Sequence, residues 1–180
     1  DILPMKGGLG SFAYKYGDLY VGAIVAVNAA GNIVNPGNGD IIAGAHTKDG
    51  TFIDLEAYTM TDMYKAPSSV ENTTIGCIVT NAKLTKAEAK KLAEMAHDGF
   101  ARAIHPVHTA SDGDTIFTIA LGDVVTSDTT WDMESVNMNL LGVMAVNAME
   151  NAIVNAGESA ETLLGVEGRA SMENIQLTQP

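Results

Sequence analysis

Three short apolar runs constrain the fold of this chain most strongly. They read LYVGAIVAVN (19–28), IGCIVT (75–80) and TIFTIALG (115–122), and glycine or polar residues bound each of them. Short apolar runs rich in Val, Ile and Thr predict buried strands, and the first is typical of a strand buried on both faces. All three are too short to span a bilayer. Strands of this kind need helices packed on their sheet, which predicts layers of helix and sheet.

Two segments predict these helices. Thr85-Lys86-Ala87-Glu88 has the spacing of a capping box, and apolar residues follow at helical spacing as far as Pro106. A second helix is predicted over roughly 132–156, apolar on more than one face, with Gly157 as its C-cap. The order strand, strand, helix, strand, helix predicts an α/β protein, and the pattern leaves open whether the strands are parallel.

The remaining segments predict loops within a single domain. KGGLG (6–10) indicates a tight glycine loop, and residues 35–50 have the composition of a loop. With 180 residues, of which 46% are hydrophobic, the chain 1–180 is long enough to bury one core.

Charge and cysteine content exclude several classes of function. The net charge of −12 repels phosphate backbones and anionic lipids, so neither nucleic acid nor a membrane is an expected partner. Cys77 is the only cysteine and lies within an apolar run, so we expect a buried thiol and no internal disulfide. The start, DILPMKGG, lacks the apolar segment of a signal peptide, which favours a soluble, cytoplasmic protein.

The stretch ENTTIGCIVT (71–80) holds the first candidate for chemistry. It follows a loop that contains Pro67, and Thr73 stands at the mouth of a predicted strand. A threonine hydroxyl needs a nearby base to act as a nucleophile. Cleavage between Asn72 and Thr73 would free an α-amine with a pKa of roughly 7.7–8.0, which is able to take the hydroxyl proton. The alternative is that two threonines simply lead into a buried strand.

Two further polar groups have both a chemical and a structural interpretation. Asp112 and Asp114 flank a glycine, so their carboxylates are able to converge on an amine and orient it; the alternative is an acidic turn before a strand. Asn28 ends the first apolar run, where its carboxamide N–H could stabilise an oxyanion; the alternative is a strand cap before the turn at Gly31.

The histidines give a weaker signal. His105 and His108 flank Pro106 and, with Asp112, suggest a metal, but the spacing offers no further ligand, so neither a metal nor a cofactor is predicted. His97 lies within the first predicted helix, where we expect it to serve packing or to face solvent.

Several of these motifs together resemble one enzyme family. The run 72–122, with KGGLGS (6–11) and VGAIVAVNAAG (21–31), resembles the self-processing L-aminopeptidase/D-Ala-esterase and β-peptidyl aminopeptidase family. The Asn-Thr-Thr start and the DGDT loop are most similar to its nylon-oligomer (6-aminohexanoate-oligomer) hydrolase branch. The resemblance extends to about residue 155, and the separate motifs occur in the family's order.

This resemblance implies a fold and a reaction. The fold is an αββα sandwich of the N-terminal-nucleophile type, cut between Asn72 and Thr73 into fragments 1–72 and 73–180 that assemble into larger homo-oligomers. The reaction is hydrolysis of amide bonds in short peptides or amide oligomers through an acyl-threonine intermediate. A free amine end on the substrate is expected, because acidic groups are able to hold it.

The resemblance also implies roles for individual residues. Thr73 matches the nucleophile, and Asn28 resembles the asparagine that stabilises the oxyanion. Asp112 and Asp114 match the carboxylates that position the threonine. Lys6 matches a lysine near that threonine.

The sequence departs from the family in two respects and leaves two other functions open. Family members extend well before residue 1, so we expect this chain to be a fragment, or one part of an assembly whose other part is a separate chain. Many relatives use Ser at the cleavage point, which leaves the substrate open. Acyl transfer, as in ornithine acetyltransferase, and a non-catalytic, unprocessed binding or assembly protein are the alternatives.

Overall fold

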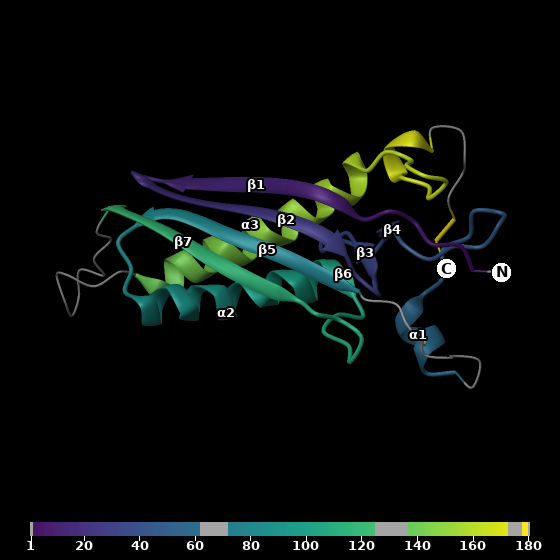
Figure 1. Ribbon diagram of the computed structural model, residues 1–180, viewed down its shortest axis with the longest axis horizontal. Coiled ribbons are helices and arrows are strands. Elements are labelled where there is room, and N and C mark those ends of the chain that lie inside the picture. The colour runs from purple at the N-terminus through teal and green to yellow at the C-terminus, as the bar shows by residue number, and fades with distance from the viewer. Residues whose placement is uncertain (1, 62–71, 125–136, 173–177, 180) are drawn as a thin grey trace.

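The computed structural model describes residues 2–61, 72–124, 137–172 and 178–179. Four long strands form its main sheet: β1 (Gly8–Tyr16), β2 (Leu19–Asn28), β5 (Thr73–Ala82) and β7 (Thr115–Val124). Their spatial order is β1–β2–β5–β7, and they run along the length of the molecule in Figure 1. β2 pairs antiparallel with β1 and with β5, whereas β7 pairs parallel with β5. The sheet is therefore mixed, which answers the question of strand direction.

The three predicted strands are confirmed, and a fourth is new. β5 begins at Thr73 rather than Ile75, so the candidate nucleophile is itself a strand residue. The predicted glycine loop over 6–10 is wrong from Gly8 onward, because β1 begins there. These glycines allow close packing instead: a Cβ on Gly10 would lie 2.0 Å from the carbonyl oxygen of Ala152.

Both predicted helices are present, with one error at an end. α2 (Lys86–Ala103) has the predicted capping box: the Thr85 hydroxyl accepts from the Glu88 N–H, and the Glu88 carboxylate accepts from the Thr85 N–H. α3 (Met138–Ser159) has Ala160 as its C-cap, so the prediction of Gly157 as the C-cap is wrong. The predicted residues 132–136 lie outside the described ranges. None of the helices within those ranges has the length and apolar character needed to cross a membrane.

Gly157 has a packing role that explains this error. A Cβ there would lie 3.0 Å from Cδ1 of Ile33, which is buried in the core. The missing side chain lets α3 approach the segment that follows β2, and the helix continues through the glycine to Ser159.

The two helices cover the same face of the main sheet. α3 packs on β1 and β2, α2 packs on β7, and the helices pack on each other. Along β2 burial alternates strictly, with the odd-numbered residues from Leu19 to Val27 buried. The prediction that this strand is buried on both faces is therefore wrong for the described residues, because helices cover one face only.

The opposite face of the sheet carries exposed apolar side chains, and we call it the open face. Its residues share one direction of the pleat across four strands. They are Leu9, Tyr20, Ile24, Ile75, Val79, Phe117, Ile119 and Leu121. Cys77 belongs to the same row of β5 and is half-buried rather than buried as predicted.

A smaller sheet follows the end of β2. It consists of β4 (Ile41–Ala43), β3 (Asn32–Val34) and β6 (Ile104–His105) in that order. β4 lies within the predicted loop 35–50, which is otherwise irregular. Two short helices, α1 (Leu55–Thr59) and the 3-10 helix η1 (Arg169–Ser171), lie beyond this sheet, at the same end of the molecule in Figure 1.

Candidate active site

The candidate site lies where β2 ends and β5 begins. Asn28 and Thr73 are cross-strand partners at the last position of the β2–β5 ladder. Because side chains alternate along a strand, Thr73 points to the same side as Ile75, and Asn28 to the same side as Ile24. Both candidate residues therefore face the open side of the sheet.

The peptide group between Asn72 and Thr73 has well-defined contacts. The Thr73 hydroxyl donates to the carbonyl oxygen of Asn72 at 2.6 Å. The backbone N–H of Gly113 donates to the same oxygen at 2.9 Å. The Gly113 N–H, at this distance, is placed to stabilise negative charge on that oxygen. The loop predicted before Asn72, with Pro67, lies outside the described residues.

Gly113 is placed so that only glycine fits without displacing the hydroxyl. A Cβ at this position would lie 2.9 Å from Thr73 Oγ1. The glycine between the two aspartates therefore leaves room for the threonine hydroxyl and supplies an N–H to the adjacent carbonyl.

Asp112 ties the loop before β7 to the turn after β2. Its carboxylate accepts from the N–H and the hydroxyl of Thr109, at 2.9 and 2.6 Å, and from the N–H of Ala30 at 3.3 Å. Asn72 and Asp112 also form an isolated parallel bridge. This carboxylate thus fixes the loop that carries Gly113 against Asn72.

Asp114 holds the next backbone group of β5. Its Oδ1 accepts from the Thr74 N–H at 2.8 Å, and its Oδ2 lies 2.7 Å from Nδ1 of His108. Only 4% of the Asp114 side chain is exposed, so these contacts replace water around its charge. Asp114 therefore contacts the backbone next to Thr73 directly, whereas Asp112 acts through the loop that carries Gly113.

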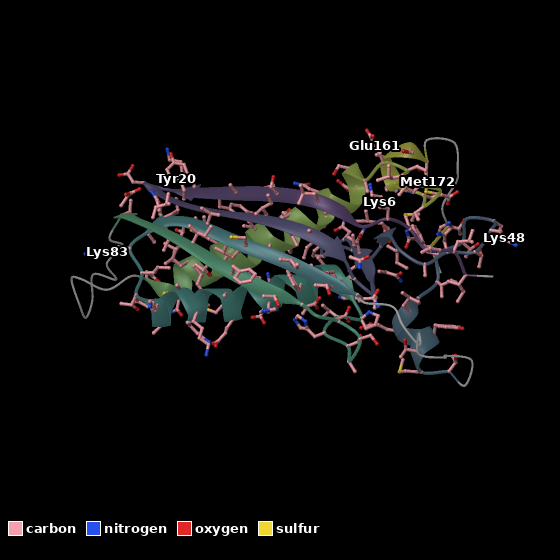
Figure 2. All side chains as sticks on the ribbon, viewed as in Figure 1. Lys6, Tyr20, Lys48, Lys83, Glu161 and Met172 are labelled. Atoms are coloured by element: carbon pink, nitrogen blue, oxygen red, sulfur yellow. The ribbon has the colours of Figure 1, made fainter. Side chains whose placement is uncertain are left out.

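Lys6 lies on the other side of Asn28. The two residues line a small cavity of about 40 Å³ together with Gly31. The Lys6 ammonium donates to the carbonyl oxygen of Glu161 at 3.3 Å, and Figure 2 labels both residues, on the segment before β1 and beyond α3. The structure thus brings Lys6 next to Asn28 and places its charge against the segment that follows α3.

The histidines separate into two groups. His105 lies 3.2 Å from the carbonyl oxygen of Ala101 and does not join His108 and Asp112 in the arrangement suggested for a metal. His108 instead contacts Asp114 through Nδ1 and His97 through Nε2, at 2.7 and 3.1 Å. His97, expected to serve packing or to face solvent, therefore belongs to a polar chain that leads to the site.

Sequence reasoning missed two of the groups that surround Thr73. The DGD pattern presents Gly113 only as a spacer between carboxylates, although a glycine in such a loop also frees a backbone N–H to approach a neighbour. The eleven-residue separation of His97 and His108 has no motif, since one lies on α2 and the other on a loop. Only the fold brings those two rings together.

Residues 2–171 match the model of peptidase family S58. The chain belongs to this family. It is 34% identical over 174 residues to an uncharacterized aminopeptidase of Mycobacterium leprae, covering 90% of this chain and 47% of that protein. It is 31% identical over 160 residues to a 6-aminohexanoate-oligomer endohydrolase of Paenarthrobacter ureafaciens, covering 84% of this chain and 44% of that protein.

The fold of this S58 chain also matches a solved structure. The L-aminopeptidase D-Ala-esterase/amidase of Ochrobactrum anthropi, described as a variant of the Ntn hydrolase fold, superposes with a TM-score of 0.56 and 23% sequence identity. The match covers 88% of this chain and 42% of that one. The predicted fold class, an N-terminal-nucleophile type of α/β protein, is confirmed. The chain spans about half the length of the curated relatives that it matches.

Proposed function

We propose that this S58 chain is the catalytic part of an N-terminal-threonine amidohydrolase. It cleaves itself between Asn72 and Thr73 and then hydrolyses amide bonds in short peptides or amide oligomers. The observation that carries this proposal is the Asn72 carbonyl oxygen, which receives hydrogen bonds from both Thr73 Oγ1 and the Gly113 N–H. The hydroxyl thus lies against the carbonyl group that self-cleavage requires it to attack.

Self-cleavage proceeds as an acyl shift followed by hydrolysis. Thr73 Oγ1 attacks the carbonyl carbon of Asn72, and the carbonyl oxygen becomes an oxyanion that the Gly113 N–H stabilises. The proton that leaves Oγ1 passes to the nitrogen of Thr73, the C–N bond breaks, and an ester joins Asn72 to the threonine oxygen. Water adds to this ester, which leaves a carboxylate on Asn72 and a free hydroxyl and amine on Thr73.

Turnover repeats this chemistry on a substrate. The α-amine of Thr73 accepts the hydroxyl proton as Oγ1 attacks the substrate carbonyl, and it returns a proton to the leaving amine. The acyl-threonine ester is then hydrolysed by water. Asn28, directly opposite Thr73 in the ladder, is the side chain best placed to donate to the substrate oxyanion.

The two carboxylates and Lys6 position these groups. Asp114 holds the backbone N–H of Thr74, Asp112 holds the loop that carries Gly113, and their negative charge stabilises the ammonium that forms when the Thr73 amine takes the hydroxyl proton. Lys6 lines the cavity beside Asn28 and donates to the carbonyl oxygen of Glu161, so it holds the segment after α3 against this end of the site.

A second layer completes this site. Thr73 and Asn28 face the open side of the sheet, and that side carries exposed apolar residues such as Phe117 and Ile119. Apolar patches of this kind mark sites of association. Polypeptide outside residues 1–180, on the same or a separate chain, covers this face as the second sheet of the sandwich, and the whole assembles into a homo-oligomer.

The substrate carries a free amine near the bond that is cut. The net charge of −12 attracts cations. Asp40, Asp54 and Glu56 line an open cavity of about 240 Å³ next to β3, the strand that follows the turn after Asn28. Short amine-ended peptides and 6-aminohexanoate-type oligomers both meet this requirement.

Substitution of Thr73 tests the proposal directly. In the full-length protein, Thr73→Ala is expected to abolish both self-cleavage and turnover, because it removes the attacking oxygen. Thr73→Ser is expected to retain both, because the hydroxyl remains. The control is Thr118→Val, which removes a buried hydroxyl that has no partner among the described residues. Denaturing mass spectrometry counts the fragments, and N-terminal sequencing of the second fragment is expected to read Thr-Thr-Ile-Gly.

Two results would contradict this mechanism. One is a Thr73→Ala protein that still yields two fragments. The other is an active wild-type preparation that contains a single, uncut chain. Adding amine acceptors to the assay distinguishes hydrolysis from acyl transfer, because a transferase releases the acylated amine in preference to the acid.

A further inference from the structure

A chain of three side chains leads from the surface of α2 to the backbone beside Thr73. His97 Nδ1 lies 3.1 Å from His108 Nε2, and His108 Nδ1 lies 2.7 Å from Asp114 Oδ2. The other oxygen of Asp114 accepts from the Thr74 N–H at 2.8 Å. These contacts form an unbroken series that connects both imidazole rings to the first residues of β5.

The hydrogen-bonding capacity of these groups fixes where the protons are. Asp114 as a carboxylate only accepts, so Nδ1 of His108 carries a proton. Only one further proton fits between the two rings. Either His97 donates it from Nδ1 to a neutral His108, or a charged His108 donates it from Nε2 to His97.

The surroundings disfavour a charge on His97. Burial lowers the pKa of His97, and the neighbouring His108 lowers it further, whereas Asp114 and Asp98 act in the opposite direction. Phe100 contacts both rings, with centroid distances of 5.3 Å to His97 and 5.9 Å to His108. His97 is therefore a neutral hydrogen-bond partner of His108, and only His108 contacts Asp114.

His108 is also held in an unusual backbone conformation. Its φ is 53°, in the left-handed region that non-glycine residues rarely adopt. Such conformations cost free energy and persist where the surrounding structure enforces them, often at functional sites. Here the conformation accompanies a ring that reaches Asp114 and His97 at the same time.

We propose that His108 is a positioning residue which holds Asp114, and through it the start of β5, while His97 sets the proton on His108. The relay makes the reactivity of Thr73 depend on the hydrogen bond between His108 and Asp114. This inference rests on the proposed function, since it concerns the same threonine. The nearby Asp112 is held by Thr109 and Ala30 instead, so the relay acts on one of the two carboxylates.

Two substitutions of His108 separate its hydrogen bond from its backbone. His108→Gly and His108→Asn both tolerate a positive φ. Asn places an amide N–H close to the position of Nδ1, but it takes up no proton, whereas Gly leaves Asp114 without this donor. His108→Gly is expected to slow self-cleavage of the full-length precursor by roughly tenfold or more, and His108→Asn is expected to restore most of that rate.

Rescue by the conservative variant provides the readout that a loss of folding would not give. Asn restores a donor to Asp114 without an imidazole ring, so recovery of the rate with Asn assigns the effect to this hydrogen bond. His97→Phe is expected to slow self-cleavage less than His108→Gly, because it removes only the ring that contacts Nε2 of His108.

Cleavage rates are measured by quenching a short pulse of cell-free synthesis and separating precursor from fragments. The control is His105→Gln, a nearby histidine whose ring contacts only the Ala101 carbonyl oxygen among the described hydrogen bonds. Rates of the His108 variants that match the rate of His105→Gln would overturn the relay. A His108→Asn rate as low as that of His108→Gly would also overturn it, because the restored donor would then have no effect.

A spectroscopic measurement keeps this inference separate from the proposed function. In uncut, full-length Thr73→Ala protein, the imidazole ¹⁵N shifts of His108 are expected to report a proton on Nδ1, and Asp114→Asn is expected to perturb them. Unperturbed shifts contradict the relay even if cleavage occurs in the wild type. Perturbed shifts in a protein whose wild type is never cut support the contacts and refute the proposed function instead.

Discussion

The two faces of the main sheet have similar apolar composition but very different surroundings. On the helix-covered face, Val21, Val25 and Ile78 are almost completely buried under α2 and α3. On the open face, Ile24, Phe117 and Ile119 are between 46% and 59% exposed. The strands thus carry apolar side chains on both faces of the sheet, although the described residues cover only one of those faces.

This difference separates stability from chemistry within one sheet. The helix-covered face carries the core of the domain. Thr73 and Asn28 lie at the end of the open face, where the packing that would enclose a substrate is not part of the described chain. Four experiments distinguish the faces, and they follow in order of decreasing expected effect.

The largest effect is expected at Gly10, on the helix-covered face. A Cβ there would lie 2.0 Å from a backbone oxygen of α3, so Gly10→Ala is expected to cost about 3 kcal/mol or more, or to prevent folding. Gly22 is the matched control on the open face, where a Cβ would be 3.6 Å from its nearest neighbour, Ala13 Cβ. Urea denaturation followed by circular dichroism measures both, and equal losses for the two variants would show that the helix contact is not close.

The second experiment truncates one isoleucine on each face. Ile78→Ala leaves a cavity in the core and is expected to cost about 2–5 kcal/mol. Ile24→Ala, at a residue 46% exposed, is expected to cost about 1 kcal/mol or less. The same denaturation measurement on residues 1–180 compares them. A large loss for Ile24→Ala would mean that the open face is already covered within this chain.

The third experiment places a charge on the open face. Phe117→Lys is expected to change the stability of residues 1–180 by less than about 1 kcal/mol, because the side chain is 59% exposed. In the full-length protein the same change is expected to disrupt assembly, since it puts a charge into an apolar contact. Analytical ultracentrifugation measures assembly, with Lys83→Glu, at the far end of β5, as the control (Figure 2). Unchanged assembly of the Phe117→Lys protein would contradict a cover on this face.

The smallest effect uses Cys77 as a reporter of the open face. Burial raises the pKa of the Cys77 thiol, so its reaction with a disulfide reagent is expected to be slower at pH 7.5 than that of a free thiol. The rate should rise roughly tenfold per pH unit below that pKa, because only the thiolate reacts. Protection of Cys77 in the full-length protein, relative to residues 1–180, would locate the cover over β5. Equal reaction rates of Cys77 in the two proteins would mean that the cover does not lie over this part of β5.

Local patterns predicted the elements of this fold well, but they did not predict its layers. The capping box at Thr85 predicted the start of α2, because that signal depends only on nearby residues. The burial of β2 on one face depends on which helices this chain contains, and no strand pattern encodes that. Gly10 was interpreted as part of a turn and Gly157 as a helix cap. The sequence does not show that Gly10 faces a backbone oxygen or that Gly157 faces a core side chain.

The residues of the candidate site also divide into those that motifs predicted and those that only the fold revealed. Thr73, Asn28, Asp112 and Asp114 were predicted from motifs, and the structure places all four around one peptide bond. The amide of Gly113 and the ring of His108 were not predicted, because their contacts form only when the loop before β7 folds against the start of β5. Their use in catalysis stays a prediction until Thr73 and His108 are substituted.

The order of strands in the main sheet determines what a nick after Asn72 would produce. β1 and β2 would belong to one polypeptide and β5 and β7 to the other, so the new boundary would run down the middle of a continuous sheet. The ladder from Val21–Thr80 to Asn28–Thr73 would hold this seam closed, and α3 would bridge it by lying on β1 and β2. The two pieces would therefore copurify as one body, each carrying half of the strand pair that frames the reacting threonine.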